Sequence, residues 1–452
     1  MNVLFRSPVG ALLARPWLDA VGLAGLRRWY FPLSRLWAAA NAAGEDFSHF
    51  SELMGPTPPP LWPAPFVRGL LGRNRRARDA AAAARLAWDR AFAADAGDFG
   101  ALDRRRRLAA TRHLSTRGLF YPLLFPRRMP LARWHIGSRE AVERDLVAAL
   151  ADPASLYAPP REPVAFEQSP AFAREGVREY WLRAASPAAR LQCRPGSETV
   201  YARVVEPVAA PARHTLIFGS GLCLETDLLA IGRDSAGRLA ELGWRTIEPV
   251  SPYHGLRTMP GTYGGEPFFA EGPIGALDLI AGQTIESAAL IGWARRRFGR
   301  KVALAGISMT SFVAQQAASH CRDWPEELRP DAVMLISHSG RVEEVTFGGA
   351  LTATIGLDRA LIDAGWSREA LARVSRLIDP APEPGLSPAR IVSVLGETDR
   401  WVPYEHGLGL ARQWRLPESN ITRYPLGHLG MPVQLMRDST PFDRLRRVLD
   451  EA

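Results

Sequence analysis

The sequence contains little cysteine and almost no lysine. The three cysteines, Cys193, Cys223 and Cys321, are widely spaced and odd in number, which indicates neither a disulfide framework nor a metal-binding spacing. Lys301 is the single lysine, so the 56 basic residues are almost all arginine. Because arginine is favoured along the whole chain, the net charge of +9 is weak evidence for an anionic partner. No nucleic-acid-binding module is recognisable, so we expect no nucleic-acid partner. Since the cysteines show no metal-binding spacing, we also expect no metal, and we expect no cofactor.

Long apolar runs are also missing. No segment holds about 18 consecutive uncharged apolar residues, which argues against a transmembrane helix. The first 14 residues lack the long apolar stretch of a secretory signal. The 47% hydrophobic content is ordinary for a globular protein, and 452 residues suffice for one large or two moderate domains. We therefore expect a cytoplasmic protein.

One segment combines a strand pattern, a serine and a helix pattern. Residues 301–304 form an apolar run typical of a buried strand, and residues 312–318 are typical of a helix. Ser308 stands between them with Gly306 two positions earlier, as in a nucleophile elbow. The usual motif has a glycine where this chain has Thr310, and the alternative interpretation is an ordinary serine that caps a helix.

Two later segments supply an acid and a histidine in the order that the elbow requires. A strand predicted over 389–396 leads to Asp399, and a strand predicted over 420–424 leads to His428. An α/β enzyme with a nucleophile elbow places its partners in the order serine, acid, histidine. The three residues therefore form a candidate catalytic triad.

Each member of this triad has a defined chemical role. Ser308 would attack an acyl carbonyl, His428 would take its proton, and Asp399 would orient the imidazole and stabilise its charged form. Glu397 is the alternative acid. His406 falls inside a helix predicted over 403–415, which favours a surface position for it.

The oxyanion formed during acyl transfer needs backbone N–H donors that are already in place. One donor is expected from Met309, the residue after the nucleophile. The second is expected from the loop 219–223 that follows a strand predicted over 214–218, with Leu222 or Gly221 as the donor. The alternative for this loop is a simple turn between a strand and a helix.

Together these segments resemble the α/β-hydrolase superfamily. A narrower resemblance links the loop 247–257 to the Pro-Tyr-Tyr-Gly-x-Arg loop of the α/β-hydrolase domain-containing protein 18-like family. In that family a helix with Glu-Ser-Ala-Ala follows, as at 286–289 here, and then Gly-Ile-Ser-Met-Gly-Gly, which here reads Gly-Ile-Ser-Met-Thr-Ser at 306–311. The resemblance covers about residues 175–450. It implies an α/β-hydrolase fold, a mostly parallel central sheet flanked by helices, and serine-hydrolase activity on lipid or other acyl esters.

Three further residues are candidates for substrate contact. Arg257, in the loop after a strand, has a planar guanidinium that fits a phosphate or carboxylate, and Tyr253 belongs to the same loop. The alternative for Arg257 is an arginine that holds a long loop through backbone carbonyls. His338 follows the strand after the elbow, where it would line the rim of the site or serve the structure.

The chain divides into a front part and a hydrolase part. Residues 1–170 are expected to form an arginine-rich helical extension, and residues 171–452 the α/β-hydrolase domain with a helical cap at about 338–387. Apolar residues of this cap would line the acyl pocket, or the insertion is an exterior helical pair. Within the extension, helical patterns, basic runs and an apolar cluster occur at 18–42 (interrupted by Pro32), 73–78, 80–94, 104–107 and 118–125.

Basic runs beside aromatic clusters are typical of a surface that lies on an anionic bilayer. The alternative is a set of helices packed on the hydrolase core, with the arginines on the solvated face. We therefore predict a serine hydrolase that cleaves a carboxylic ester or thioester, with a lipid-like ester as the expected substrate. Peripheral contact with a membrane is a further expectation. The competing functions are an acyltransferase with the same triad and a catalytically silent, membrane-associated binding protein.

Overall fold

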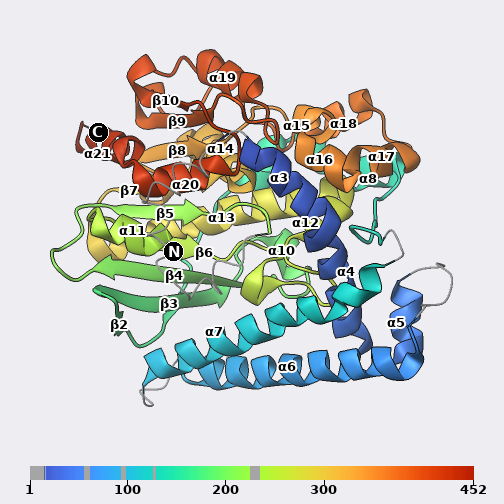
Figure 1. Ribbon diagram of the computed structural model, residues 1–452. Coiled ribbons are helices and arrows are strands. Elements are labelled where there is room, and N and C mark those ends of the chain that lie inside the picture. The colour runs from blue at the N-terminus through green and yellow to red at the C-terminus, as the bar shows by residue number, and fades with distance from the viewer. Residues whose placement is uncertain are drawn as a thin grey trace.

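The fold is built around one twisted sheet. The computed structural model describes residues 15, 17–54, 62–92, 98–125, 129–223 and 235–451, and it places a ten-stranded sheet at the centre with helices on both sides (Figure 1). The strands are β1 (Glu167–Gln168), β2 (Phe172–Arg174), β3 (Val177–Ala185), β4 (Thr199–Pro207), β5 (Thr215–Gly219), β6 (Arg245–Pro249), β7 (Val302–Ile307), β8 (Ala332–Ile336), β9 (Ile391–Gly396) and β10 (Ile421–Tyr424).

The strand order identifies the architecture. It runs β1-β3-β4-β6-β5-β7-β8-β9-β10, with β2 paired to β3 at the edge. Every neighbouring pair from β6 to β10 is parallel, whereas β1 to β4 pair antiparallel. A mostly parallel sheet flanked by helices confirms the prediction of an α/β-hydrolase fold.

Alternating side chains of the strands bury both faces of the sheet. On β7, Val302 and Leu304 face one cluster while Ala303 and Ala305 face the other, because successive strand residues point to opposite sides. The first cluster includes α13 (Gly272–Phe298), α14 (Met309–His320) and α19 (Tyr404–Gln413); the second includes α11 (Ser235–Glu241), α20 (Gly430–Arg437) and α21 (Thr440–Glu451). The sheet is therefore the middle layer of three. In such a sheet a binding site is expected at the carboxyl ends of the parallel strands.

Helix α13 is long and apolar enough to span a bilayer by length and composition. Its most apolar window has a mean hydropathy of 1.3, but 89% of that window is buried inside the protein. Burial of this kind is what a core helix of a globular domain shows.

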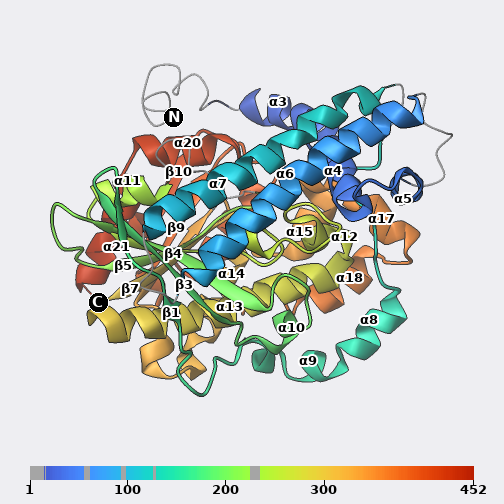
Figure 2. The same ribbon diagram turned by 90° about the horizontal axis from the view of Figure 1, so that it is seen from below.

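The chain before β1 is helical and packs onto the sheet and its loops. Its elements are α3 (Trp17–Gly25), η1 (Leu26–Tyr30), α4 (Phe31–Ala43), α5 (Phe47–Leu53), α6 (Ala64–Arg90), α7 (Phe99–Ser115), η2 (Thr116–Leu124), α8 (Arg139–Asp145), α9 (Val147–Ala151) and η3 (Pro153–Tyr157). Helices α6 and α7 lie side by side along the β3 side of the molecule (Figures 1 and 2). The interface buries Trp88 and Phe92 of α6 and its following turn against Trp181 and Tyr201 of the sheet.

The largest apolar cluster joins this front part to the rest of the molecule. It contains side chains of α4 and η2, of α12 (Glu266–Ala270) and the start of α13, and of the helices between β8 and β9. Those helices are α15 (Val342–Gly348), α16 (Ala350–Ile355), α17 (Leu357–Asp363) and α18 (Arg368–Ser375). A buried ion pair at 2.8 Å between Arg35 of α4 and Glu266 of α12 crosses the same interface. The remaining short elements are α10 (Ala189–Gln192), η4 (Gly255–Arg257), η5 (Cys321–Asp323), η6 (Glu326–Leu328), η7 (Pro388–Arg390) and η8 (Glu418–Asn420).

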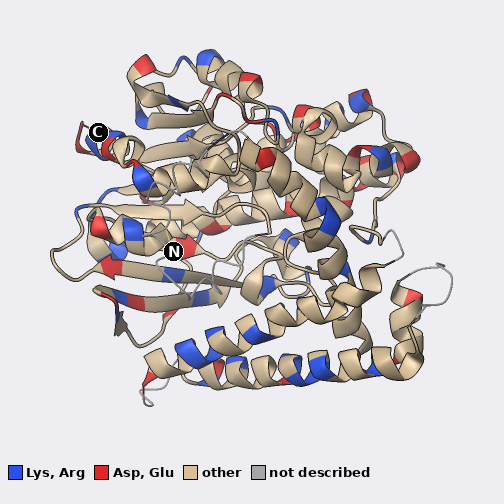
Figure 3. Cartoon of the chain, viewed as in Figure 1, with Lys and Arg blue, Asp and Glu red and all other residues tan. Residues whose placement is uncertain are grey.

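The arginine run of α7 is divided between solvent and interior. Arg104 and Arg105 are exposed, whereas Arg106 and Arg107 are buried. The buried pair binds the carboxylate of Asp103, and Arg107 also binds Glu179 of β3. Basic positions recur along α6 and α7, separated by uncharged ones (Figure 3). Half of this run therefore ties α7 to the sheet instead of facing water.

Candidate active site

Ser308 occupies the sharp turn between β7 and α14. Its backbone has φ 55° and ψ −116°, a conformation that costs a non-glycine residue about 1–3 kcal/mol. A Cβ on Gly306 would stand 2.1 Å from the carbonyl oxygen of Thr310, so only glycine fits there. The elbow therefore has both the strained serine and the glycine that the turn requires.

Thr310, the departure from the usual motif, fits because of a glycine on the neighbouring strand. A Cβ on Gly219, which pairs with Gly306 across β5 and β7, would lie 2.7 Å from the Thr310 Cβ. The Thr310 hydroxyl accepts a hydrogen bond from the Ile307 N–H at 3.0 Å and lies 3.2 Å from the Ile307 carbonyl oxygen, to which it donates. The missing side chain at Gly219 thus provides the room that the motif usually gains from a glycine at position 310.

The structure brings Ser308, His428 and Asp399 together. The His428 Nε2 lies 2.9 Å from the Ser308 Oγ, and the Nδ1 lies 2.7 Å from the Asp399 Oδ2. The second oxygen of Asp399 accepts hydrogen bonds from the N–H groups of Trp401 and Val402 at 2.9 and 3.0 Å. These two bonds fix the buried carboxylate, and the carboxylate in turn fixes the imidazole.

The surroundings of His428 set its protonation. Burial lowers the pKa of His428, but the charge and hydrogen bond of Asp399 and the charge of Asp19 raise it, and the net shift is upward. An Nδ1–H donated to Asp399 leaves the Nε2 lone pair facing the Ser308 hydroxyl. The Trp401 indole stacks on the ring with centroids 5.1 Å apart. The imidazole is therefore placed and polarised to accept the serine proton.

The two alternative residues lie apart from this arrangement. Glu397 is exposed. The ring of His406 pairs with Glu344 at 3.7 Å. Neither residue takes part in the chain of hydrogen bonds that links Ser308 to Asp399.

The predicted oxyanion donors lie on the two elements that flank Ser308. Met309 opens α14, and among the residues that the structure describes its N–H donates to no other group. In the loop after β5, the Cys223 N–H donates to the Nε2 of His254 at 3.0 Å, so this N–H is occupied. Gly221 and Leu222 stay as the predicted source of the second donor.

His254 is a residue that the sequence did not single out. Its Nδ1 donates to the Pro252 carbonyl at 2.8 Å and its Nε2 accepts from Cys223, so a neutral ring ties the loop after β6 to the loop after β5. Burial lowers the pKa of His254 to about 4, which keeps this ring uncharged. No spacing in the sequence indicates this contact.

Asp19 of α3 is the second residue that sequence reasoning missed. Its carboxylate accepts hydrogen bonds from the N–H groups of His428 and Leu429, at 2.7 and 2.8 Å. The partners are more than 400 positions apart in the chain, and a lone aspartate in a helical pattern gives no signal of such a contact.

The three residues proposed to contact substrate are held within the protein. Arg257 is fully buried, and its guanidinium binds both oxygens of Glu286 at 2.8 Å and the carbonyls of Val250 and Ser197. The residue thus holds its own loop, as in the alternative interpretation. Tyr253 is fully buried in the large apolar cluster.

His338 is likewise buried, and its Nε2 lies 2.8 Å from the Ser393 Oγ. Burial lowers the pKa of His338 to about 3, so the ring is neutral. All three side chains are thus buried in the protein, and contact of Arg257, Tyr253 and His338 with a bound substrate stays a prediction.

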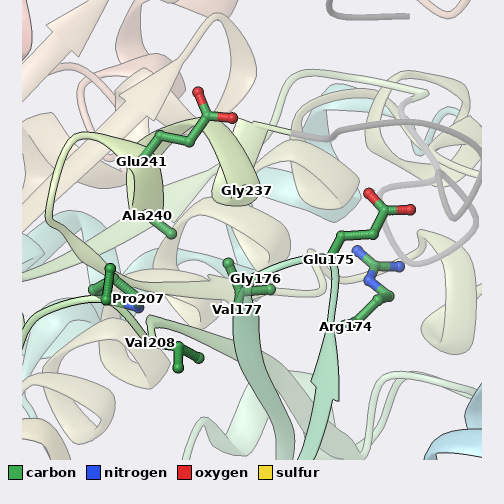
Figure 4. A pocket seen from close by; sticks show the side chains of 10 residues that line it. Arg174, Glu175, Gly176, Val177, Pro207, Val208, Gly237, Ala240 and Glu241 are labelled. Atoms are coloured by element: carbon green, nitrogen blue, oxygen red, sulfur yellow. The ribbon is translucent and has the colours of Figure 1, made fainter.

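A pocket of about 270 Å³ lies elsewhere on the surface (Figure 4). It lies between the start of β3, the end of β4 and helix α11, and its lining residues include Glu175, Val177, Pro207 and Glu241. Val177 pairs with Pro207, and β4 runs antiparallel to β6. The pocket therefore sits at the amino ends of the parallel strands, at the sheet edge opposite to Ser308.

Among the described residues, no group of three or more His, Cys, Asp or Glu side chains forms a metal site.

No protein-family model and no curated protein sequence matches the chain. Several solved structures resemble it. An acetyl xylan esterase from Paenibacillus sp. R4 is 13% identical, with 68% of this chain and 94% of that chain covered and a TM-score of 0.47.

Two further structures are similar. A cold-adapted esterase from an Arctic intertidal metagenomic library is 16% identical, with 62% of this chain and 97% of that chain covered and a TM-score of 0.40. Acetyl xylan esterase 1 from Thermoanaerobacterium sp. JW/SL YS485 is 14% identical, with 68% and 96% covered and a TM-score of 0.41. At these identities the likeness concerns the fold alone.

Proposed function

We propose that this chain is a serine hydrolase that cleaves a carboxylic ester or thioester through an acyl-Ser308 intermediate. The observation that carries the proposal is the continuous hydrogen-bonded path from the Ser308 Oγ through His428 to Asp399. A serine hydroxyl is a weak nucleophile until a base accepts its proton, and this geometry supplies that base.

The reaction follows from these contacts. The Ser308 Oγ attacks the acyl carbon while the His428 Nε2 takes the proton, and Asp399 stabilises the imidazolium that forms. The Met309 N–H and the start of α14 stabilise the negative oxygen of the tetrahedral intermediate. As the bond to the leaving alcohol or thiol breaks, Nε2 returns the proton to it. Water activated by the same imidazole then releases the acid from Ser308.

The surroundings of Ser308 favour an apolar acyl group. Met309 and Phe312, on the first turn of α14, belong to the largest apolar cluster, as does the partly buried Leu222 of the loop after β5. Apolar residues of α15 and α16 pack against the same cluster. An acyl chain bound beside the elbow would meet hydrocarbon on several sides, which supports a lipid-like ester as substrate.

A fluorophosphonate probe tests the nucleophile. We expect the wild type to be labelled and Ser308→Ala to be unlabelled, with esterase activity reduced on the order of a thousandfold or more. Ser287→Ala is the matched control, because Ser287 is a buried serine in α13 whose hydroxyl donates to the Gln283 carbonyl of the same helix. Labelling that persists in Ser308→Ala contradicts the assignment.

The pH dependence of labelling tests the base. His428 must be neutral to accept the proton, and its neighbours hold its pKa above the ordinary histidine value of about 6.5. The labelling rate should therefore fall as the pH is lowered through this raised pKa.

Product analysis with added alcohols or thiols separates hydrolysis from acyl transfer, which would use the same acyl-enzyme. A wild type without labelling or esterase activity would favour a silent binding protein.

A further inference from the structure

Helix α3 packs directly on the loop that carries His428. Asp19 accepts the N–H groups of His428 and Leu429, and a Cβ on Gly427 would lie 2.3 Å from the Asp19 Oδ2. One turn further along α3, a Cβ on Gly22 would lie 2.1 Å from the Leu429 Cδ1. A glycine on each side thus permits this close approach of helix and loop.

Asp19 lies in the first turn of α3, where an acidic side chain also favours the helix, and both of its carboxylate oxygens accept N–H groups of the histidine loop. Asp19 as a whole residue is 8% exposed, and burying a charge of this kind is costly unless it is hydrogen-bonded. The pKa of Asp19 is raised on balance: burial raises it, the hydrogen bonds from Leu429 and His428 lower it, the charge of Asp399 raises it and the charge of His428 lowers it. Two N–H groups of the histidine loop thus satisfy an aspartate contributed by the opposite end of the chain.

We propose that Asp19 is a positioning residue for His428: it fixes the backbone of the histidine loop and adds a second negative charge beside the imidazole. This inference rests on the proposed hydrolase function. The front part of the chain then supplies a piece of the active site, in addition to packing on the hydrolase core.

The expected effects have a definite sign. The charged groups that act on His428 are Asp399, from the loop after β9, and Asp19, from α3, and both raise the pKa of the imidazole. Loss of the Asp19 charge must therefore lower that pKa, so the acidic limb of the labelling rate moves to lower pH. Loss of one acceptor also frees the loop, and a misplaced base slows the reaction.

Asp19→Asn is the test, and Asp46→Asn is its matched control. Asp46 also lies in the front part of the chain and also accepts two backbone N–H groups, those of Ser48 and His49. We expect Asp19→Asn to slow fluorophosphonate labelling by roughly 10- to 100-fold at the optimum, and to move the acidic limb to lower pH. Asp46→Asn should leave the acidic limb unchanged. Equal behaviour of the two variants overturns the proposal.

A conservative variant separates charge from folding. Asp19→Glu retains the charge, so its acidic limb should stay near that of the wild type even where its rate is reduced. If Asp19→Asn lacks the melting transition of the wild type, Asp19→Glu decides the matter. An acidic limb displaced in Asp19→Glu would overturn the role of the charge.

A direct titration keeps this inference distinct from the proposed function. The His428 Cε1–H resonance, identified by its loss in His428→Gln, reports the imidazole pKa by NMR without any turnover. A lower pKa in Asp19→Asn than in the wild type supports the proposal, and an unchanged pKa overturns it. A wild type that is never labelled counts against the hydrolase function alone, because the titration still reads the coupling of Asp19 to His428.

Discussion

At the level of single residues, the sequence indicates the triad because each of its members lies in a short pattern that can be recognised locally. Ser308, Asp399 and His428 each follow a recognisable strand, and parallel strands bring their carboxyl ends to one edge. The partner of Thr310 has no such local pattern. Gly219 lies 91 positions earlier, and its role depends on the pairing of β5 with β7. Only the assembled sheet reveals why a threonine is tolerated in the elbow.

This contact predicts a coupled pair of substitutions. Gly219→Ala places a Cβ 2.7 Å from the Thr310 Cβ, between a central strand and a buried helix, and should reduce the free energy of unfolding by about 1–3 kcal/mol. Adding Thr310→Gly removes the clash, so the double variant should lose less stability than the sum of the two single variants, by about 0.5–3 kcal/mol. Chemical denaturation measures all three.

A glycine without such a neighbour provides the control. Gly409 in α19 is exposed and has nothing near the position of a Cβ. Gly409→Ala should therefore be neutral or stabilise the protein by about 0.4–1 kcal/mol. Strict additivity of Gly219→Ala and Thr310→Gly would show that the two sites do not interact.

At the level of elements, the sequence predicts the strands near the site more accurately than the helices of the front part. The predicted strand at 420–424 corresponds to β10 (Ile421–Tyr424). The alanine-rich helix predicted over 80–94 matches, at 80–90, the second part of a longer helix, α6, which begins at Ala64 and includes the arginines at 73–78; residues 93 and 94 lie outside the described residues. In the sequence these arginines read as a basic run because charge dominates the local pattern, although arginine is a good helix former.

The helical pattern at 18–42 shows a related effect. The chain stays helical through Pro32, because the π-helical turn η1 (Leu26–Tyr30) precedes it and Pro32 falls in the first turn of α4. A proline is tolerated there, since the first N–H groups of a helix lack intrahelical acceptors. The predicted interruption thus becomes a change of helical pitch.

The ion pair between α4 and α12 predicts how strongly the front part is attached. Glu266 binds Arg35 at 2.8 Å and accepts the N–H groups of Arg133 and Tyr263. Arg35→Met leaves this buried carboxylate without its counter-charge and should lower the free energy of unfolding by about 3–5 kcal/mol. Denaturant unfolding measures the loss, and the double variant Arg35→Met/Glu266→Gln should recover part of it. A single variant as stable as the wild type would contradict this role.

At the level of the whole molecule, long-range contacts decide what the front part does. Its buried arginines and apolar side chains attach it to the sheet and to the helices between β8 and β9, and Asp19 reaches the histidine loop. None of these contacts follows from composition, because a buried arginine and an exposed one look the same in sequence. The helices that pack on the core still leave an aromatic surface open to solvent.

This surface, the aromatic patch, comprises Trp62, Phe66, Tyr121 and Phe125, each 36–50% exposed. The Trp62 and Phe66 rings lie 5.3 Å apart, Tyr121 and Phe125 lie 5.7 Å apart, and the Trp62 Nε1–H donates to the carbonyl of Pro122, which joins the two pairs. Arg68, two positions after Phe66 in α6, is also exposed. Aromatic rings beside arginines suit the interface of an anionic bilayer, which supports the proposed peripheral membrane contact.

Vesicle sedimentation measures this contact. We expect the wild type to bind vesicles of phosphatidylcholine with phosphatidylserine more strongly than vesicles of phosphatidylcholine alone, and less strongly at high salt. Trp62→Ala/Phe125→Ala should weaken partitioning by roughly tenfold or more, because each large side chain contributes about 1.5–3 kcal/mol when fully buried. Leu86→Ala is the control, since Leu86 is equally exposed but lies near the opposite end of α6. An equal loss of vesicle binding in both variants would show that the aromatic patch is not the membrane contact. We expect unchanged fluorophosphonate labelling in both variants, which would show that membrane binding is separate from the chemistry at Ser308.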